Sequence, residues 1–130
     1  MAIINQATEE IVKELISDTP SVIQEKYNKL KTGQKDWQKV SLNKRIECVI
    51  KFGDLIRQNI DGLALLLTTE VGKPITQSYN EIKGAHGRID FFSNQSRQWL
   101  QDEWMVKEGA THEKISFEPL GVIANISAWN

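Results

Sequence analysis

The chain has 130 residues, of which 40% are hydrophobic and 25% charged, and its formal net charge is −1. This is the size and composition of one globular domain, and it is unlike the composition of a disordered chain. Lys and Arg are scattered among Asp and Glu without a basic stripe, so we expect no nucleic-acid partner.

The first 60 residues predict a hairpin followed by two helices. Two short apolar runs flank the polar stretch "NQATEE" within the first 16 residues, which indicates a β-hairpin. Pro20-Ser21 then opens a helix with a 3.6-residue apolar period that ends near Trp37. Ser41 is the expected N-cap of a second helix, which runs to about Asn59. The wide apolar surface of this second helix predicts that it is covered on more than one side.

Two further helices follow. Asp61 is the expected cap of the third helix, through "GLALLLTTEV", and Gly72 is expected to end it. Pro74 fits the first turn of a long fourth helix over about Ile75–Gln101.

The end of the chain combines interior glycines with an extended pattern. Gly84 and Gly87 lie inside the fourth helix, where each costs about 1 kcal/mol relative to Ala, so we expect close packing against a neighbouring element there. After "QDEWMVKEGATHEK" the pattern becomes extended, from Ile115 to a closing strand over Val122–Ile126. The predicted plan is therefore a hairpin, four helices and then strands.

Five side chains are candidates for chemistry. Cys48 lies in mid-helix with no His nearby in sequence, which favours a buried packing thiol over a nucleophile. His86 and His112 are far apart, with no Cys or carboxylate at ligand spacing, so we expect no metal site. Glu70 and Glu81 lie near helix ends and could act as bases, but a cap or salt-bridge role is favoured.

The closing stretch "ISAWN" places the Asn130 amide directly after an apolar strand. A rigid strand end can hold an amide donor for a developing oxyanion. Asn at a strand end is also a common turn residue, so this pattern alone leaves both interpretations open.

Three features of the sequence bear on the cellular compartment of the protein. The N-terminal stretch "MAIINQATEE" has neither a basic region nor a long apolar core, so we expect no secretory signal. The longest apolar run, Leu63 to Leu67, is far below the roughly 20 residues of a membrane span. A single cysteine excludes an internal disulfide. We expect a cytoplasmic protein that does not cross a membrane.

Three stretches together resemble the N-terminal portion of an aldehyde dehydrogenase: "DWQKVSLNKRIECVIKFGDLIRQN", "EVGKPI" and "EPLGVIANISAWN". The resemblance covers the whole chain in order and is nearest to the succinate-semialdehyde type. In the hairpin, "INQATEE" replaces the family's Asn-Pro-Ala-Thr-Gly-Glu, with Gln6 and Glu10 assigned to the Pro and Gly positions, and Ala128 stands where the family usually has Pro. The implied fold is α/β: residues 1–130 form the helical N-terminal part of an incomplete cofactor-binding domain, with a β-hairpin, about four helices, and strands at the C-terminal end.

The resemblance implies an oxidoreductase that converts a small-molecule aldehyde, with succinate semialdehyde as one candidate, to the carboxylic acid using NAD or NADP. In the family, a cysteine attacks the aldehyde, hydride leaves to the nicotinamide, and a Glu-activated water hydrolyses the thioester. Asn130 matches the Asn whose amide donates to the oxyanion, and Trp129 with Asn130 would border the cofactor pocket. Full-length members are dimers or tetramers, so a homo-oligomer is implied.

The chain lacks the family's nucleophilic Cys, general-base Glu and phosphate-binding turn, and Cys48 falls at a structural position. We therefore expect the N-terminal segment of a longer enzyme, inactive by itself. Two alternatives are a non-catalytic interaction module that docks a partner by strand addition and a truncated remnant.

Overall fold

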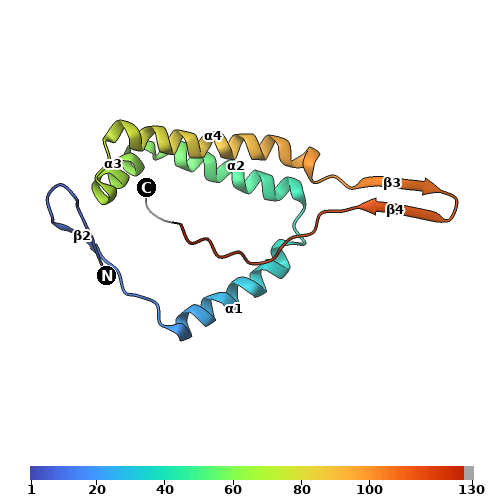
Figure 1. Cartoon of the computed structure of the whole chain (residues 1–130), viewed down its shortest axis with the longest axis horizontal. Helices are drawn as coiled ribbons and strands as arrows, with labels where there is room; N and C mark the ends of the chain where they lie inside the picture. The colour runs from blue at the N-terminus through green and yellow to red at the C-terminus, as the bar shows by residue number, and fades with distance from the viewer. Residues whose placement is uncertain (128–130) are drawn as a thin grey trace.

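The computed structural model describes residues 1–127, so the predicted sites at Trp129 and Asn130 lie outside the described residues. Figure 1 shows α2, α3 and α4 packed together, with α1 set apart and the β3–β4 hairpin projecting away from the helices. This arrangement confirms the predicted hairpin, four helices and later strands. The elements in chain order are β1 (Ala2–Ile4), β2 (Ile11–Glu14), α1 (Pro20–Trp37), α2 (Leu42–Gln58), α3 (Ile60–Val71), α4 (Ile75–Trp99), β3 (Glu103–Glu108) and β4 (Thr111–Ile115).

The N-terminal hairpin closes through a loop that the Asn5 side chain organises. Strands β1 and β2 pair antiparallel, and the Asn5 carboxamide oxygen accepts a hydrogen bond from the Ala7 N–H at 2.9 Å. Glu9 has a φ of 61°, in the left-handed region that a non-glycine residue occupies at a cost of about 1–2 kcal/mol. Glu9, and not Glu10, therefore takes the place of the glycine in the family's hairpin motif, which corrects the assignment made from sequence.

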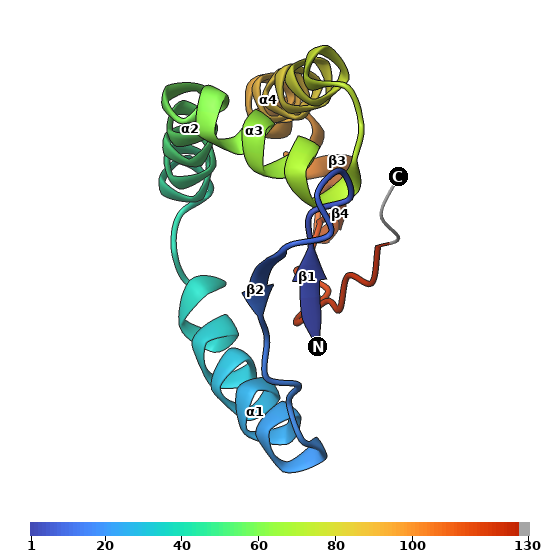
Figure 2. The same ribbon diagram turned by 90° about the vertical axis from the view of Figure 1, so that its left-hand side faces the viewer.

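Helix α1 forms locally but is not buried. The Thr19 hydroxyl accepts a hydrogen bond from the Val22 N–H, and Pro20 occupies the first helical position, so both N-terminal signals are present. No residue of α1 is buried, and the view in Figure 2 shows the helix below the α2–α4 unit. The helix therefore owes its bounds to caps and propensity rather than to packing.

The packed core lies between α2, α3 and α4. Ile46 of α2 is 4% exposed and Ala64 of α3 is fully buried. A Cβ added at Gly53 would lie 3.0 Å from Ile89 Cγ2, so α2 and α4 approach closely at this glycine.

A Cβ at Gly84 or Gly87 would meet nothing within 4 Å, so the predicted close packing at those two glycines is wrong. Helical spacing reveals an interior glycine, but it does not say which face of the helix is covered.

The helix termini test the predicted caps. Ser41 caps α2 with its side chain, and Gly72 ends α3 with a φ of 77°, as predicted. The predicted Asp61 cap is wrong, because α3 begins at Ile60 and Asp61 lies inside its first turn. Pro74 precedes α4 as its N-cap instead of lying in its first turn. Asn59, which directly precedes Ile60, is already the C-cap of α2, so the chain passes from α2 into α3 without a separate capping loop.

The C-terminal third differs most from expectation. The hairpin of β3 and β4, with Gly109 in its turn, occupies a stretch to which sequence reasoning assigned no element. The strand expected over Val122–Ile126 is not formed, since residues 116–127 have no regular secondary structure. An extended segment becomes a strand only by hydrogen bonding to a neighbour, and no neighbouring strand pairs with this one in the described part of the chain.

Candidate functional site

The segment that leads to the predicted site passes beside α1. A cavity of about 410 Å³ lies between them. It is lined on the helix by Leu30 and Trp37, among others, and on the segment by Gly121, Val122 and Ile123. Gly121 has a φ of 102°, a left-handed conformation that a side chain would strain. This glycine is the "PLGV" glycine of the sequence motif, so the motif has a conformational reason at this position.

Just before the predicted site, the segment is exposed. The Ser127 hydroxyl donates to the Asn125 Oδ1 at 2.8 Å, so these two polar side chains pair within the segment itself. Ile123 is 71% exposed and Ile126 is 96% exposed. Because residues of opposite parity point to opposite faces of an extended chain, both faces carry uncovered apolar side chains, as in strands that parallel sheets bury on both sides.

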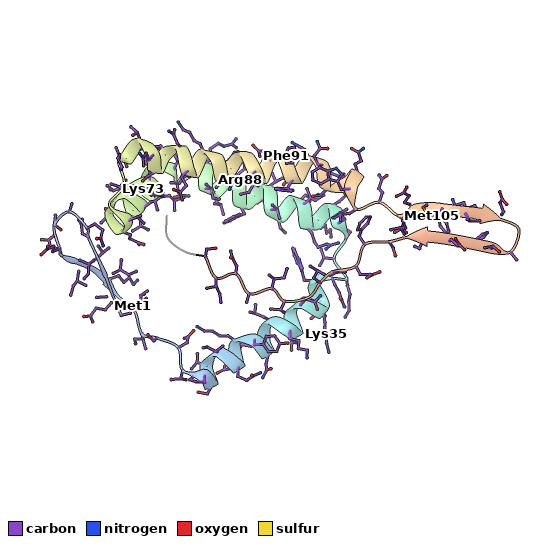
Figure 3. All side chains as sticks on the ribbon, viewed as in Figure 1. Met1, Lys35, Lys73, Arg88, Phe91 and Met105 are labelled. Atoms are coloured by element: carbon purple, nitrogen blue, oxygen red, sulfur yellow. The ribbon has the colours of Figure 1, made fainter. Side chains whose placement is uncertain are left out.

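The "EVGKPI" motif forms a junction between α3, α4 and the N-terminal hairpin. The Gly72 N–H donates to the Thr68 carbonyl at 2.8 Å, and the Gln6 N–H donates to the Thr69 carbonyl at 3.3 Å. The Lys73 ammonium, whose side chain is only 13% exposed, pairs with Glu81 Oε2 at 2.5 Å. Figure 3 marks Lys73 beside the turn between the two helices. The motif therefore fixes the α3–α4 turn, and the predicted salt-bridge role of Glu81 is confirmed.

The other predicted reactive side chains have structural surroundings. Cys48 is exposed, so the prediction of a buried thiol is wrong. On the same apolar line of α2, Phe52 is 57% exposed and Leu55 is 56% exposed, so the prediction that α2 is covered on more than one side is wrong for the described residues. His86 has an 18% exposed side chain, and its Nδ1 lies 3.1 Å from Asp90 Oδ2, so it is a packed histidine beside a carboxylate of its own helix. Glu70 is half-buried and makes no ion pair within residues 1–127.

Two hydrogen bonds that sequence reasoning missed join α3 to α4. The Tyr79 hydroxyl donates to Asp61 Oδ1 at 2.8 Å, and this hydrogen bond raises the pKa of Tyr79 above its ordinary value of 10.0. The hydroxyls of Thr68 and the fully buried Ser78 lie 2.9 Å apart. The partners are 18 and 10 residues apart in sequence, so no local motif signals either pair.

The described residues form neither a metal centre nor a membrane span. Over residues 1–127, no group of three or more His, Cys, Asp or Glu side chains is arranged to hold a metal ion. None of the helices in that range combines the length and apolar character needed to cross a membrane.

The chain belongs to the aldehyde dehydrogenase family, whose model matches residues 1–130. The 3,6-anhydro-alpha-L-galactose dehydrogenase of Vibrio sp. (strain EJY3) is 32% identical, over 98% of this chain and 27% of the relative. The probable succinate-semialdehyde dehydrogenase [NADP(+)] of Synechocystis sp. (strain ATCC 27184 / PCC 6803 / Kazusa) is 28% identical, over 100% of this chain and 28% of the relative. The chain thus spans about a quarter of the length of these curated relatives.

The fold is that of solved aldehyde dehydrogenases. The indole-3-acetaldehyde dehydrogenase AldA of P. syringae, in complex with NAD+, superimposes with a TM-score of 0.85 at 23% identity, over 93% of this chain and 25% of that chain. The matched region is the helical N-terminal part of the fold, which confirms the predicted fold class.

Proposed function

We propose that residues 1–130 form the N-terminal part of the cofactor-binding domain of an NAD(P)-dependent aldehyde dehydrogenase. The family match along the entire chain carries this proposal, and the arrangement of α2–α4 supports it. The reaction is oxidation of an aldehyde to the carboxylic acid. Succinate semialdehyde is the first substrate to test, because the Synechocystis relative is named for it and the cofactor in that name is NADP(+).

The described residues do not fit NAD or NADP by themselves. Dinucleotide phosphates bind where a strand leads through a glycine-rich turn into a helix N-terminus. Within residues 1–127, the only helix that follows a glycine turn is α4, and a helix, not a strand, precedes that turn. Cofactor binding therefore belongs to the longer enzyme, in which Trp129 and Asn130 are proposed to border the cofactor.

The proposed catalytic residue of this chain is Asn130. Its side-chain amide would donate a hydrogen bond to the oxyanion that forms when the nucleophile attacks the aldehyde. Such a donor acts only if its backbone is held rigidly. Segment 116–127 supplies that backbone, and its two uncovered faces are suited to a place inside a parallel sheet.

Asn130→Ala in the active full-length enzyme tests this role. Loss of one oxyanion donor lowers kcat by about 10²–10³, which corresponds to ~2.7–4 kcal/mol. The matched control is Asn125→Ala, whose amide pairs only with Ser127 among the described residues and should leave kcat within about threefold of the parent. A fall in kcat that is equal for the two variants would remove Asn130 from the mechanism.

The isolated 130-residue chain is predicted to form no NAD(P)H in the presence of an aldehyde. A homo-oligomeric state and a cytoplasmic location stay predictions. The interaction-module alternative rests on the exposed apolar side chains of Ile123 and Ile126. Hydrogen exchange separates the two functions: an unpaired docking edge exchanges its 122–126 amides quickly in the native protein, and a strand inside a sheet protects them.

A further inference from the structure

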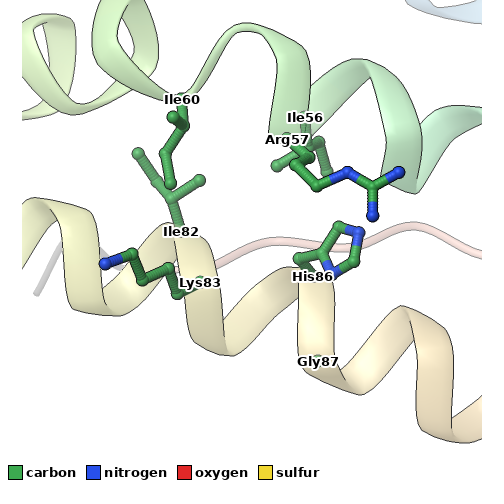
Figure 4. A pocket seen from close by; sticks show the side chains of 7 residues that line it. All are labelled: Ile56, Arg57, Ile60, Ile82, Lys83, His86 and Gly87. Atoms are coloured by element: carbon green, nitrogen blue, oxygen red, sulfur yellow. The ribbon is translucent and has the colours of Figure 1, made fainter.

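A second pocket on the helical unit combines an aliphatic floor with basic side chains. It encloses about 300 Å³ between α2 and α4, next to the start of α3. Figure 4 shows Lys83 on one side of Ile60 and Ile82, and Arg57 with His86 on the other side. No carboxylate is among the residues that line the pocket in the described structure. The pocket thus has two cationic ends separated by an apolar middle.

The two long cationic side chains are available to a ligand. Arg57 Nη2 lies 2.5 Å from Asp54 Oδ1, but the two side chains are 64% and 41% exposed, so this ion pair is weak and exchanges readily with other anions. A guanidinium has five N–H donors, and the Asp54 contact uses one nitrogen. Lys83 is exposed and makes no ion pair with any residue of the described chain.

His86 forms a wall of the pocket and is not a donor to the ligand. Its Nδ1 is engaged by Asp90, and its Nε2 lies 3.8 Å from the Cβ position built on Gly53, so the ring edge faces α2. The aliphatic floor consists of Ile56, Ile60 and Ile82. A ligand that matches this pocket therefore carries an anion at each end and methylene groups between them.

We propose that this pocket binds a short aliphatic α,ω-dicarboxylate, with one carboxylate on Arg57 and the other on Lys83. Arg pairs with a carboxylate through two parallel N–H groups, and the Lys ammonium acts as a point charge. The methylene groups cover the isoleucine floor and remove it from water. The residues that line the pocket belong to α2, α3 and α4, and none belongs to segment 116–127, so the test of this pocket is independent of the proposed dehydrogenase function.

Titration of the isotope-labelled full-length polypeptide that carries residues 1–130 with glutarate, followed by backbone amide NMR at constant ionic strength, tests the proposal. We expect saturable shifts at residues 56, 57, 82 and 83, with affinity on the order of millimolar. Butyrate, which keeps the methylene groups but has only one carboxylate, should bind about fivefold more weakly, because one exposed ion pair is lost. Inorganic phosphate, a compact anion, should not reproduce the shifts at the isoleucines.

The decisive variant is Lys83→Gln, with Lys51→Gln as the matched control on an exposed position of α2 that does not line the pocket. Lys83→Gln should weaken glutarate about fivefold and leave butyrate unchanged, and Lys51→Gln should alter neither. Gln is a good helix former, so the fold should persist, and the amide spectrum outside the pocket verifies this. Arg57→Gln is the second variant and should weaken both ligands. Equal binding of glutarate and butyrate, or equal effects of Lys83→Gln and Lys51→Gln, would overturn the proposal.

Discussion

The α2–α4 unit and helix α1 come from similar sequence patterns but reach different states. Both regions have amphipathic helices with N-terminal caps. In the α2–α4 unit, each helix contributes buried residues, whereas α1 contributes none. Helix α1 shares with segment 116–127 a cavity between partly exposed apolar surfaces. The difference shows that an amphipathic pattern predicts a helix and does not predict whether its apolar face is covered by the same stretch of chain.

This contrast agrees with the share of the family that the chain represents. The chain spans about a quarter of the length of its curated relatives, and under the proposed function the rest of the enzyme would cover apolar surfaces that this segment leaves exposed. A groove of about 600 Å³ along α2, α3 and α4 is a second exposed apolar surface of this kind, and Phe52, Leu55 and Leu66 are among the residues that line it. A stability difference between the two regions follows, and it can be tested by substitution.

The largest expected effect is that of Ile46→Ala. This side chain is 4% exposed between α2 and α4, and truncation of a buried Ile costs about 2–5 kcal/mol. Ile23→Ala on α1 is the matched control, because that side chain is 57% exposed and its loss should cost less than about 0.5 kcal/mol. Urea unfolding followed by circular dichroism gives both values. Similar costs for the two variants would mean that α1 belongs to the same cooperative unit.

A smaller loss is expected from Gly72→Ala, at the "EVGKP" junction. The glycine has a φ of 77°, and an added Cβ would lie 2.9 Å from Gln6 Cβ, so the left-handed strain of about 1–2 kcal/mol is joined by a steric conflict with the hairpin. Gly87→Ala, inside α4 with open space around it, should instead stabilise the helix by about 0.5–1 kcal/mol. Thermal unfolding of the two variants should therefore shift in opposite directions. A shift in the same direction would contradict the junction assigned to Gly72.

Gly33→Ala tests whether α1 is coupled to the α2–α4 unit. An added Cβ meets nothing within 4 Å, so the substitution should raise the helical propensity of α1 by about 0.5–1 kcal/mol. If α1 is uncoupled from the α2–α4 unit, amide protection should rise in α1 alone and the unfolding midpoint of the unit should not move. Gly84→Ala, in α4, should move that midpoint upwards. Hydrogen exchange resolved by residue measures both responses, and a rise in the midpoint with Gly33→Ala would show coupling.

The smallest effect concerns the pH dependence of the α3–α4 contact. The hydrogen bond to Asp61 raises the pKa of Tyr79 above its ordinary value of 10.0. Because the folded pKa exceeds the unfolded one, this contribution to stability is complete below about pH 10 and is lost as the pH rises through the folded pKa. As the pH rises from the unfolded to the folded pKa of Tyr79, the free energy of unfolding should therefore fall more steeply for the wild type than for Tyr79→Phe. Parallel pH curves for the two proteins would contradict the Tyr79–Asp61 contact.

The sequence correctly predicted those features that depend only on residues close together in the chain, such as helix ends. Ser41 and Gly72 act on their own helix termini, so the bounds of α2 and α3 were correct at those ends. Cys48 and Gly84 were assigned wrongly, because burial depends on which neighbour covers a face and not on the spacing of apolar residues. The Asp61–Tyr79 pair was missed for the same reason, since its partners meet only after α3 and α4 pack. The predicted donor, Asn130, was reached through the family motif rather than through local chemistry.

The most direct test of the proposal is the intact mass of the polypeptide that carries residues 1–130, isolated from its own cells. As the N-terminal part of an aldehyde dehydrogenase, it should have a mass several times the 14.8 kDa of this segment, since the segment covers 27–28% of two curated relatives. The same preparation should form NAD(P)H when an aldehyde is added. A mass near 14.8 kDa, with no aldehyde-dependent activity, would contradict the proposal and favour the interaction module or the remnant.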